Sequence, residues 1–305
     1  MEIISDTTDF NIGASCAVAI GKFDGIHKGH KRLVDEINGF KERCEGLMTA
    51  VFTFDPSPVA FFGDGNYHGI TTRDEKRRIF NKFGIDYLIE YPLNSESAAM
   101  SPMDFMEKIL VAGLHAKYVV CGPDFTFGYR GAGNVKLLKN SADRLGFEVI
   151  ICEKVATDGE EISSSLIREE VERGNMERVA EYIGAPYSVT GIVQKGRQIG
   201  RTIGMPTVNL IPESDKLLPP FGVYKSTVSY GGGHYKGITN IGVQPTVTDE
   251  KKVTVETHIF DFDEDIYGKP IIVNLNHFIR PERKFESTLQ LKQQIEEDIA
   301  QAYKD

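Results

Sequence analysis

The chain has 305 residues, of which 41% are hydrophobic and 26% are charged, a composition typical of an ordinary globular protein. Its net charge of −9 disfavours a protein that coats nucleic acid, because an acidic surface is repelled by a phosphate backbone. No apolar run approaches the roughly 20 residues of a membrane span, and the N-terminus lacks the features of a signal peptide. We therefore expect a cytoplasmic protein without nucleic-acid or membrane partners, long enough for two domains.

The four cysteines all lie in the first half of the chain, and one of them is Cys44. They form no C-x-x-C pair, so they indicate neither a zinc knuckle nor a thioredoxin-like motif. The other three, Cys16, Cys121 and Cys152, lie within or beside strand-like runs. We expect these three to be buried free thiols, which suits a reducing compartment.

From residue 16 to about residue 184, apolar strand-like runs alternate with helical patterns. The strand-like runs cover residues 16–20, 47–54, 87–91, 117–121 and 147–152. One of the helices between them begins at Ser101, which acts as the cap, with Pro102 in the first turn and Asp104 completing a capping box. Alternating strands and helices predict a parallel sheet, whose ligands bind beyond the carboxyl ends of its strands.

Segment 21–30, with the sequence G-K-F-D-G-I-H-K-G-H, follows the first of these strands and precedes a helical pattern. Free backbone amides and the helix dipole at such a turn favour an anion. His27 and His30 are three residues apart, which places them on one face of the helix. The alternative is an ordinary turn with two surface histidines, but the order of strand, glycine turn, histidine, glycine and histidine favours a phosphate site.

Segment 121–128, with the sequence C-G-P-D-F-T-F-G, also follows a strand. It places two aromatic rings, Phe125 and Phe127, beside the carboxylate of Asp124 in a loop. Rings in such a loop either pack on a ligand or anchor the loop to the core, and the residues alone leave both interpretations open.

Segment 162–168, with the sequence I-S-S-S-L-I-R, precedes another helical pattern. Ser164 and Ser165 are either simple helix caps or ligand contacts. Arg168 lies on the first turn, where a guanidinium group can reach back as a bidentate phosphate clamp.

The pattern changes at about residue 185 to short strand-like runs separated by glycine turns. These runs cover residues 188–193, 223–230, 234–241, 253–260 and 271–275. They predict a small antiparallel barrel, and residues 287–303 predict a closing helix capped by Ser287 and Gln290. We therefore expect two domains, residues 1–184 and residues 185–305.

Segment 196–209, with the sequence G-R-Q-I-G-R-T-I-G-M-P-T-V-N, is a basic, glycine-rich loop. Gly196, Arg197 and Gly200 suit a loop that covers phosphates, although a hairpin with a solvated basic tip is an alternative. The segment contains neither a P-loop nor a Rossmann fingerprint. In the strand-like run 253–260, Glu256 and His258 share one face, and a glutamate there is either solvent-facing or a base.

The motif at residues 21–30 resembles the HxGH signature of the nucleotidylyltransferase superfamily. With F-D-G before the first histidine, it is similar to the N-terminal half of the prokaryotic bifunctional riboflavin kinases/FMN adenylyltransferases, often called FAD synthetases. The segments at 121–128 and 162–168 resemble that family's G-x-D-F-x-F-G and S-S-T-x-x-R elements, with Ser165 in place of threonine and Leu166 at an often basic position. The second half is similar to the family's G-R-x-x-G-x-P-T-x-N element and strand glutamate.

The resemblance implies a Rossmann-like α/β nucleotidylyltransferase domain followed by a β-barrel riboflavin kinase domain with a terminal helix. In the first domain it implies catalytic roles for His27, His30 and Arg168. It also implies a site for ATP and flavin, formed by the following residues: Gly21, Phe23, Asp24, Gly25, Ser164 and Ser165 for ATP, and Asp124, Phe125 and Phe127 for the flavin.

In the second domain the resemblance implies that Glu256 is the catalytic base, and that Thr207 and Asn209 bind Mg²⁺. Gly196, Arg197, Gly200 and Asn209 are implied to bind the phosphates of ATP. Three positions differ from the family's common residues, namely Met205, Val208 and Gln244, and the last of these removes a cation.

The resemblance implies a bifunctional enzyme that uses ATP to convert riboflavin to FMN and then FMN to FAD. The alternatives are an FMN adenylyltransferase with a weakened kinase domain, or a flavin-binding sensor or carrier without turnover. The expected partners are riboflavin, FMN and ATP, with Mg²⁺ as cofactor. The expected assembly is a monomer or a weakly self-associating chain.

Overall fold

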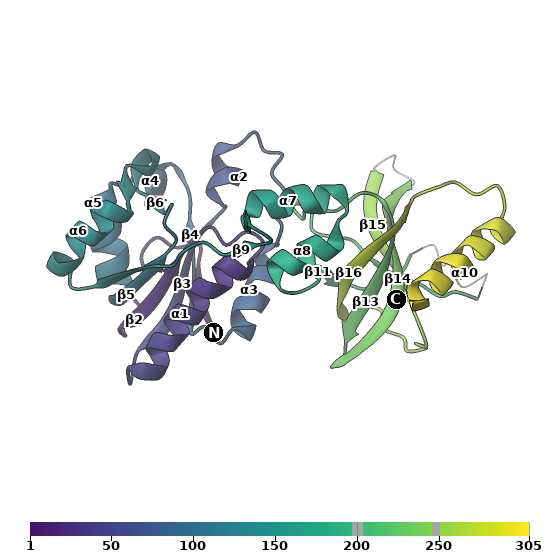
Figure 1. The fold of residues 1–305 in the computed structure, drawn as a ribbon, viewed down its shortest axis with the longest axis horizontal. Coiled ribbons are helices and arrows are strands. Elements are labelled where there is room, and N and C mark those ends of the chain that lie inside the picture. The colour runs from purple at the N-terminus through teal and green to yellow at the C-terminus, as the bar shows by residue number, and fades with distance from the viewer. Residues whose placement is uncertain (197–199, 201–203, 246–250, 305) are drawn as a thin grey trace. The chain divides into compact units, whose positions relative to one another are not determined.

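The structure is a computed structural model that describes residues 1–196, 200, 204–245 and 251–304. Its contacts divide the chain into two compact units, Met1–Ser164 and Ser165–Asp305 (Figure 1). Helices α7 (Ser164–Arg173) and α8 (Met176–Ile183) lie between this division and the expected domain limit at residues 184/185. That domain limit therefore stays a prediction.

The first unit contains a six-stranded parallel sheet with the strand order β1-β4-β3-β2-β5-β8. Its strands are β1 (Glu2–Ser5), β2 (Cys16–Ile20), β3 (Met48–Asp55), β4 (Tyr87–Pro92), β5 (Ala116–Cys121) and β8 (Glu148–Ile151). From β2 the chain adds β3 and β4 on one side and later β5 and β8 on the other. The strand order therefore reverses between β2 and β5, which is where ligands bind in open α/β sheets.

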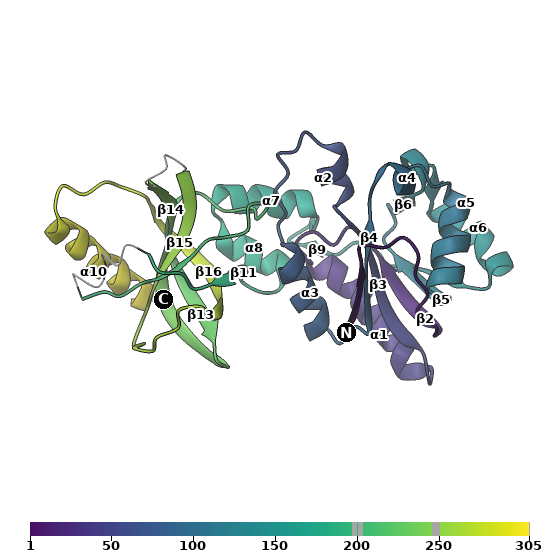
Figure 2. The same cartoon turned by 180° about the vertical axis from the view of Figure 1, so that it is seen from behind.

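Helices cover both faces of this sheet (Figure 2). The core on one face contains side chains of α1 (Lys28–Arg43) and α3 (Arg73–Lys82). The core on the other face contains side chains of the π-helix η1 (Phe105–Gly113) and of α6 (Val135–Leu145). Successive residues of β2 point into opposite cores, which explains why this strand is apolar along its whole length.

Short elements connect these layers. They are α2 (Pro58–Phe62), α4 (Ser95–Ala98), α5 (Pro102–Asp104), β6 (Thr126–Phe127), η2 (Tyr129–Gly131), β7 (Gly133–Asn134), β9 (Ala156–Thr157) and β10 (Glu160–Glu161). The predicted cap at Ser101 is confirmed, since its hydroxyl oxygen accepts a hydrogen bond from the amide of Asp104 at 3.0 Å. The helix that follows continues as η1.

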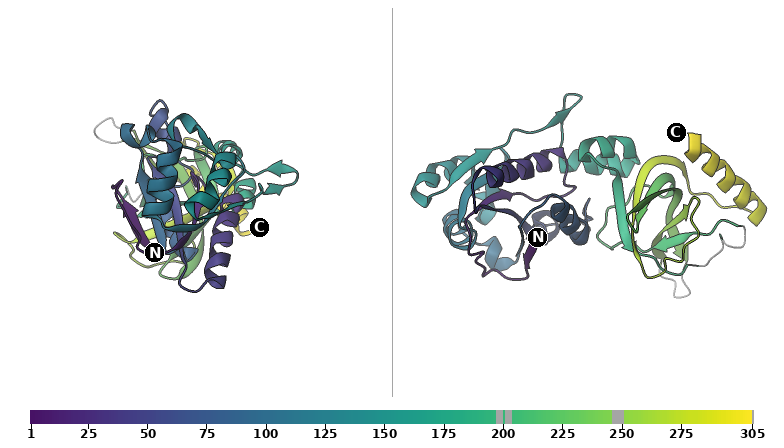
Figure 3. Two further views of the ribbon diagram at one scale, coloured as in Figure 1. Left: turned by 90° about the vertical axis from the view of Figure 1, so that its left-hand side faces the viewer. Right: turned by 90° about the horizontal axis from the view of Figure 1, so that it is seen from below.

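The second unit contains a six-stranded antiparallel sheet with the strand order β11-β16-β13-β14-β15-β12. Its strands are β11 (Tyr187–Ile192), β12 (Val208–Leu210), β13 (Gly222–Tyr230), β14 (Gly233–Pro245), β15 (Lys251–Ile259) and β16 (Pro270–Pro281). The sheet curls into a half-barrel (Figure 3). An isolated bridge between Gln194 and Asn209 links the segment after β11 to the edge strand β12.

The closing helix α10 (Thr288–Lys304) packs on this sheet, as the apolar stripe predicted. Ile295, Ile299 and Ala302 contact a core that includes Val223 and Ile238 of the sheet. None of the helices in the described part of the chain is long and apolar enough to span a bilayer. The four cysteines are unpaired, and the three expected to be buried are buried.

Candidate active sites

The turn after β2 has a strained backbone at the carboxyl edge of the first sheet. Phe23 has φ 49° and Ile26 has φ 34°, both in the left-handed region that side chains with a Cβ disfavour. Gly25 between them has φ 83°, which glycine adopts readily. Such strain costs about 1–3 kcal/mol per residue and is concentrated at functional sites.

His27 and His30 form a stacked pair, with ring centroids 3.8 Å apart. His27 is the N-cap of α1, and its Nδ1 accepts hydrogen bonds from the amides of Gly29 at 3.1 Å and His30 at 3.4 Å. A Cβ at position 29 would lie 3.0 Å from the His27 ring, so glycine allows the imidazole to fold over the first turn. These two amides are therefore paired with His27, which corrects the expectation that the first-turn amides are free for an anion.

Both histidines are held in the neutral form. Burial lowers the pKa of His27 to about 4, against a smaller opposing effect of the Asp24 carboxylate. Burial, followed by the charges of His27 and Lys76, lowers the pKa of His30 well below its usual value. Because Nδ1 of His27 is an acceptor, the proton of its neutral ring lies on Nε2, which is a hydrogen-bond donor. Nδ1 of His30 is buried without a hydrogen-bond partner in the described part of the chain.

Asp24 connects the turn to the loop that precedes α3. Its Oδ1 accepts a hydrogen bond from the amide of Ile70 at 2.8 Å, and its Oδ2 accepts one from the Tyr67 hydroxyl at 2.5 Å. Its backbone carbonyl accepts a third from the Ser164 hydroxyl at 2.8 Å. The carboxylate that the resemblance assigned to ATP binding is therefore engaged in holding the turn in place.

Lys76 on α3 is a residue that the sequence analysis missed. Phe80, one turn further along α3, packs against Phe23, which also contacts His30 (ring centroids 5.2 Å and 5.0 Å). Lys76 lies four residues before Phe80, on the same face of the helix. Burial lowers its pKa against the opposing effects of Asp24 and other carboxylates, and none of the described residues forms an ion pair with it. The sequence did contain a signal for this residue, because a lysine on the buried face of an amphipathic helix is unusual.

The loop after β5 lies beside the turn after β2, because these two strands are neighbours at the point where the strand order reverses. Phe127 is buried in the core and stacks with Phe125, with ring centroids 5.4 Å apart. Its ring therefore anchors the loop, and Phe125 is the more accessible of the two. Asp124 is exposed and forms an ion pair with Lys154 at 2.6 Å.

Helix α7 begins at Ser164, whose hydroxyl binds the turn through Asp24. Ser165 is exposed and Arg168 is half-buried. Both belong to the second unit, so the roles that the resemblance gives them at the histidine pair stay predictions.

In the second unit, the Thr207 hydroxyl donates a hydrogen bond to Oε1 of Glu256 at 2.6 Å. Thr207 also lines two cavities. The larger, about 270 Å³, is lined by Glu256 and His258, and the smaller, about 110 Å³, by Thr257 and Ile259. Alternation along β15 thus presents one pair of side chains to each cavity, and Thr207 lines both.

Asn209 lies opposite Glu256 in the pairing of β12 with β15, and Asn240 lies opposite it in the pairing of β14 with β15. The side chain of Asn209 is buried, and its Oδ1 has no hydrogen-bond partner in the described part of the chain. A Cβ at Gly196 would lie 2.4 Å from the Asn209 amide nitrogen, so the loop passes very close to this side chain.

The remaining kinase-site predictions fall on the same loop. Gly200 lines the larger cavity. Arg197 lies outside the described residues, as does the side chain of Gln244. Met205 is buried and lines the larger cavity, whereas Val208 lines the smaller one. Nδ1–H of His258 donates to the carbonyl of Pro206 at 2.8 Å, so this histidine supports the loop next to Thr207.

Comparisons with known proteins match both units. The FAD synthetase family model matches residues 10–166, and the riboflavin kinase family model matches residues 183–304. A bifunctional riboflavin kinase/FMN adenylyltransferase of Listeria monocytogenes is 34% identical over 96% of this chain and 93% of its own length. The protein of the same description from Escherichia coli is 33% identical over 93% of this chain and 90% of its own length.

One solved structure matches almost the whole chain. It is described as a macrolide-efflux protein from Streptococcus pneumoniae, has 32% sequence identity and a TM-score of 0.84, and the match covers 98% of this chain and 97% of that one. The fold of this chain is therefore represented among solved structures.

Proposed function

The chain belongs to the family of bifunctional riboflavin kinases/FMN adenylyltransferases, and we propose that its two units catalyse two successive steps. In the second unit, the 5′-hydroxyl of riboflavin attacks the γ-phosphorus of ATP, giving FMN and ADP. In the first unit, the phosphate of FMN attacks the α-phosphorus of ATP, giving FAD and pyrophosphate. The observation that carries the proposal is that each unit has its own polar cluster. The first unit has the stacked histidines, and the second has the hydrogen-bonded Thr207–Glu256 pair, in which Thr207 lines two cavities.

The adenylyl transfer needs positioned donors and cations rather than a base, because the phosphate of FMN is already a competent nucleophile. His27 offers a neutral Nε2–H donor, held in orientation by the amides of the first turn of α1. Lys76 supplies an ammonium group with no ion pair in the described part of the chain, on the helix face next to His30. Arg168 is the clamp that we assign to the triphosphate. The loop with Asp124 and Phe125 is assigned to the flavin.

The kinase step needs a base, because the ribityl hydroxyl is a poor nucleophile until it loses its proton. We assign this role to Glu256, whose carboxylate lines the larger cavity. The flavin is assigned to that cavity and the nucleotide to the smaller one. The γ-phosphate is then transferred from the nucleotide to the flavin next to Thr207, which lines both cavities.

Thr207 and Asn209, two residues apart on the chain, fit a magnesium ion. Asn209 presents a buried oxygen without a hydrogen-bond partner among the described residues, and Thr207 adds a hydroxyl oxygen. Such hard oxygen ligands suit Mg²⁺, which retains waters and takes few protein ligands. When bound, the ion would neutralise charge on the phosphates of ATP. We also place the enzyme in the cytoplasm, and its unpaired cysteines support this.

The test is incubation of the purified chain with Mg-ATP and either riboflavin or FMN, followed by chromatography of the flavins. FAD from both substrates supports the two-step proposal. FAD from FMN alone would mean that the kinase unit is inactive. No product from either substrate, with oxidised or reduced flavin, would overturn the proposal in favour of a flavin carrier.

A further inference from the structure

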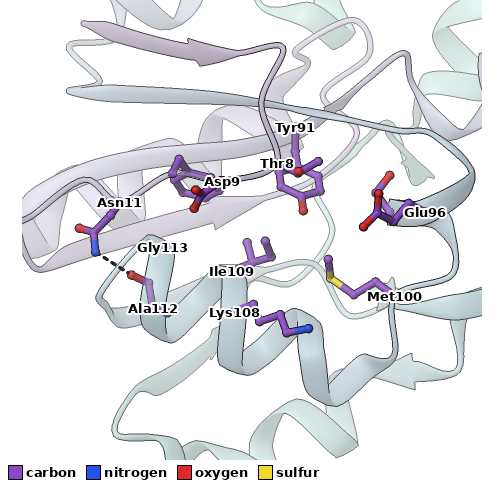
Figure 4. A pocket seen from close by; sticks show the side chains of 12 residues that line it. Thr8, Asp9, Asn11, Tyr91, Glu96, Met100, Lys108, Ile109, Ala112 and Gly113 are labelled. Atoms are coloured by element: carbon purple, nitrogen blue, oxygen red, sulfur yellow. Dashed lines mark hydrogen bonds between the residues drawn. The ribbon is translucent and has the colours of Figure 1, made fainter.

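The first unit contains a hollow of about 450 Å³ that neither proposed reaction uses. It lies between the segment after β1, the short helix α4 and the π-helix η1 (Figure 4). The residues on which the argument depends are Asp9, Tyr91, Glu96, Met100 and Ile109. Tyr91 belongs to the core on the η1 face of the sheet, whereas Leu33 and Val34 of the histidine-bearing helix α1 belong to the core on the other face.

The hydroxyl of Tyr91 points into this hollow (Figure 4). The side chain is only 3% exposed, and its ring packs against Phe10, Phe52 and Phe54 with centroids 5.4 to 6.3 Å away. The hydroxyl nevertheless forms no hydrogen bond with any residue that the structure describes. A hydroxyl held in this way by three rings is a fixed hydrogen-bonding group, and only a molecule inside the hollow can satisfy it.

The charge around this hydroxyl is negative. Asp9 and Glu96 stand on opposite sides of the hollow, and neither carboxylate has an ion pair within the described ranges of the chain (Figure 4). Burial raises the pKa of Tyr91, and the charge of Glu96 raises it further, so Glu96 acts on the hydroxyl. The cation that lines the hollow, Lys108, is paired with Asp104 at 2.8 Å.

Several of the other residues that line the hollow are apolar or already hydrogen-bonded. Met100 and Ile109 contribute a thioether and an alkyl side chain. The Asn11 side chain donates to the carbonyl of Ala112 and accepts from the amide of Gly13. A bound molecule would therefore find the Tyr91 hydroxyl, an apolar wall and two carboxylates that form no ion pair with the described residues.

We propose that this hollow binds a small organic cation, an ammonium or amidinium group on a compact apolar body. The cationic group lies between Asp9 and Glu96 and donates a hydrogen bond to the oxygen of Tyr91, while the apolar body packs on Met100 and Ile109. Charge-assisted hydrogen bonds supply the selectivity for a cation over a neutral molecule of the same shape. None of the residues that line this site is assigned to either proposed reaction.

The test uses the full chain and benzamidine as the probe, with neutral benzamide as its isosteric control, in a ligand-observed NMR titration at low salt. Benzamidine is expected to bind saturably and at least about tenfold more tightly than benzamide, which lacks the charge. Equal binding of the two molecules, or no saturable binding of benzamidine, would overturn the proposal.

Two substitutions test the residues themselves. Tyr91→Phe keeps the ring packing and removes only the hydroxyl, so it should weaken benzamidine binding about fivefold without changing the melting temperature. Glu96→Gln should weaken it about tenfold, whereas Glu45→Gln, at an exposed position remote in sequence from the hollow, should have no effect. All three variants should retain FAD formation from FMN. Wild-type affinity in a folded Tyr91→Phe or Glu96→Gln chain would show that the hollow is not this site.

Discussion

The groups that we assign to phosphate transfer in the two units differ in charge and in the way the chain brings them together. In the first unit, two neutral imidazoles come from one turn of ten residues, with a lysine contributed by α3. In the second unit, a carboxylate and an amide come from β15 and β12, and Thr207 lines two cavities. The difference follows the proposed nucleophiles: a phosphate needs donors and cations, whereas a hydroxyl needs a base.

Replacing Glu256 should give the largest difference between the activities of the two units. Glu256→Gln keeps the shape of the side chain and a hydrogen-bond acceptor for Thr207 but removes the base, so FMN formation from riboflavin should fall by about 10²–10⁴-fold. FAD formation from FMN in the same preparation is the internal control and should be unchanged. A parallel fall of both rates in a folded chain would contradict the separation of the two sites.

Replacing His27 tests the opposite unit. Asparagine is a good N-cap, so His27→Asn should preserve the start of α1 while removing the Nε2–H donor. FAD formation from FMN should fall by about 10²-fold, as when one donor to a developing charge is lost. Phosphorylation of riboflavin should continue at the wild-type rate. Unchanged FAD formation would remove His27 from the catalytic site.

Replacing Lys76 asks whether α3 contributes to the site. Lys76→Met keeps the length of the side chain and removes the ammonium group, which should slow FAD formation about tenfold because one cation is lost from the phosphate site. Stability should not fall, because that ammonium has no ion pair in the described part of the chain. Lys82→Met, at an exposed position on the same helix, is the matched control. Equal rates for the two variants would show that Lys76 has no role.

The neutral state of His27 also predicts a pH dependence of stability. Since its pKa is about 4 in the folded chain and about 6.5 when unfolded, the unfolded chain binds more protons between these values. Through His27 alone, lowering the pH from about 6.5 to about 5.5 should therefore remove about 1 kcal/mol from the free energy of unfolding. His30, whose pKa is also lowered, should add a further loss in the same direction. Urea unfolding of the wild-type chain and of His27→Asn measures this, and the variant should show a shallower dependence. Identical pH dependences would mean that His27 titrates normally.

Several features followed from local patterns in the sequence. The apolar run before the turn, the two histidines three residues apart and the shared face of Glu256 and His258 each depend on neighbours within a few residues. The structure confirms a buried strand at residues 16–20, two histidines side by side, and Glu256 and His258 lining the same cavity. The helix cap at Ser101 and the apolar stripe of the closing helix were also predicted from local patterns and are confirmed.

Other features required the tertiary structure because they join residues that are distant in the chain. The engagement of Asp24 by Tyr67 and Ile70 depends on how the loop before α3 folds back. The burial of Phe127, the position of Lys76 and the register of Asn209 with Glu256 depend on how whole elements pack. A sequence pattern specifies which face of a strand or helix a residue occupies. Only packing decides what lies opposite that face, how much water reaches it and which protonation state it favours.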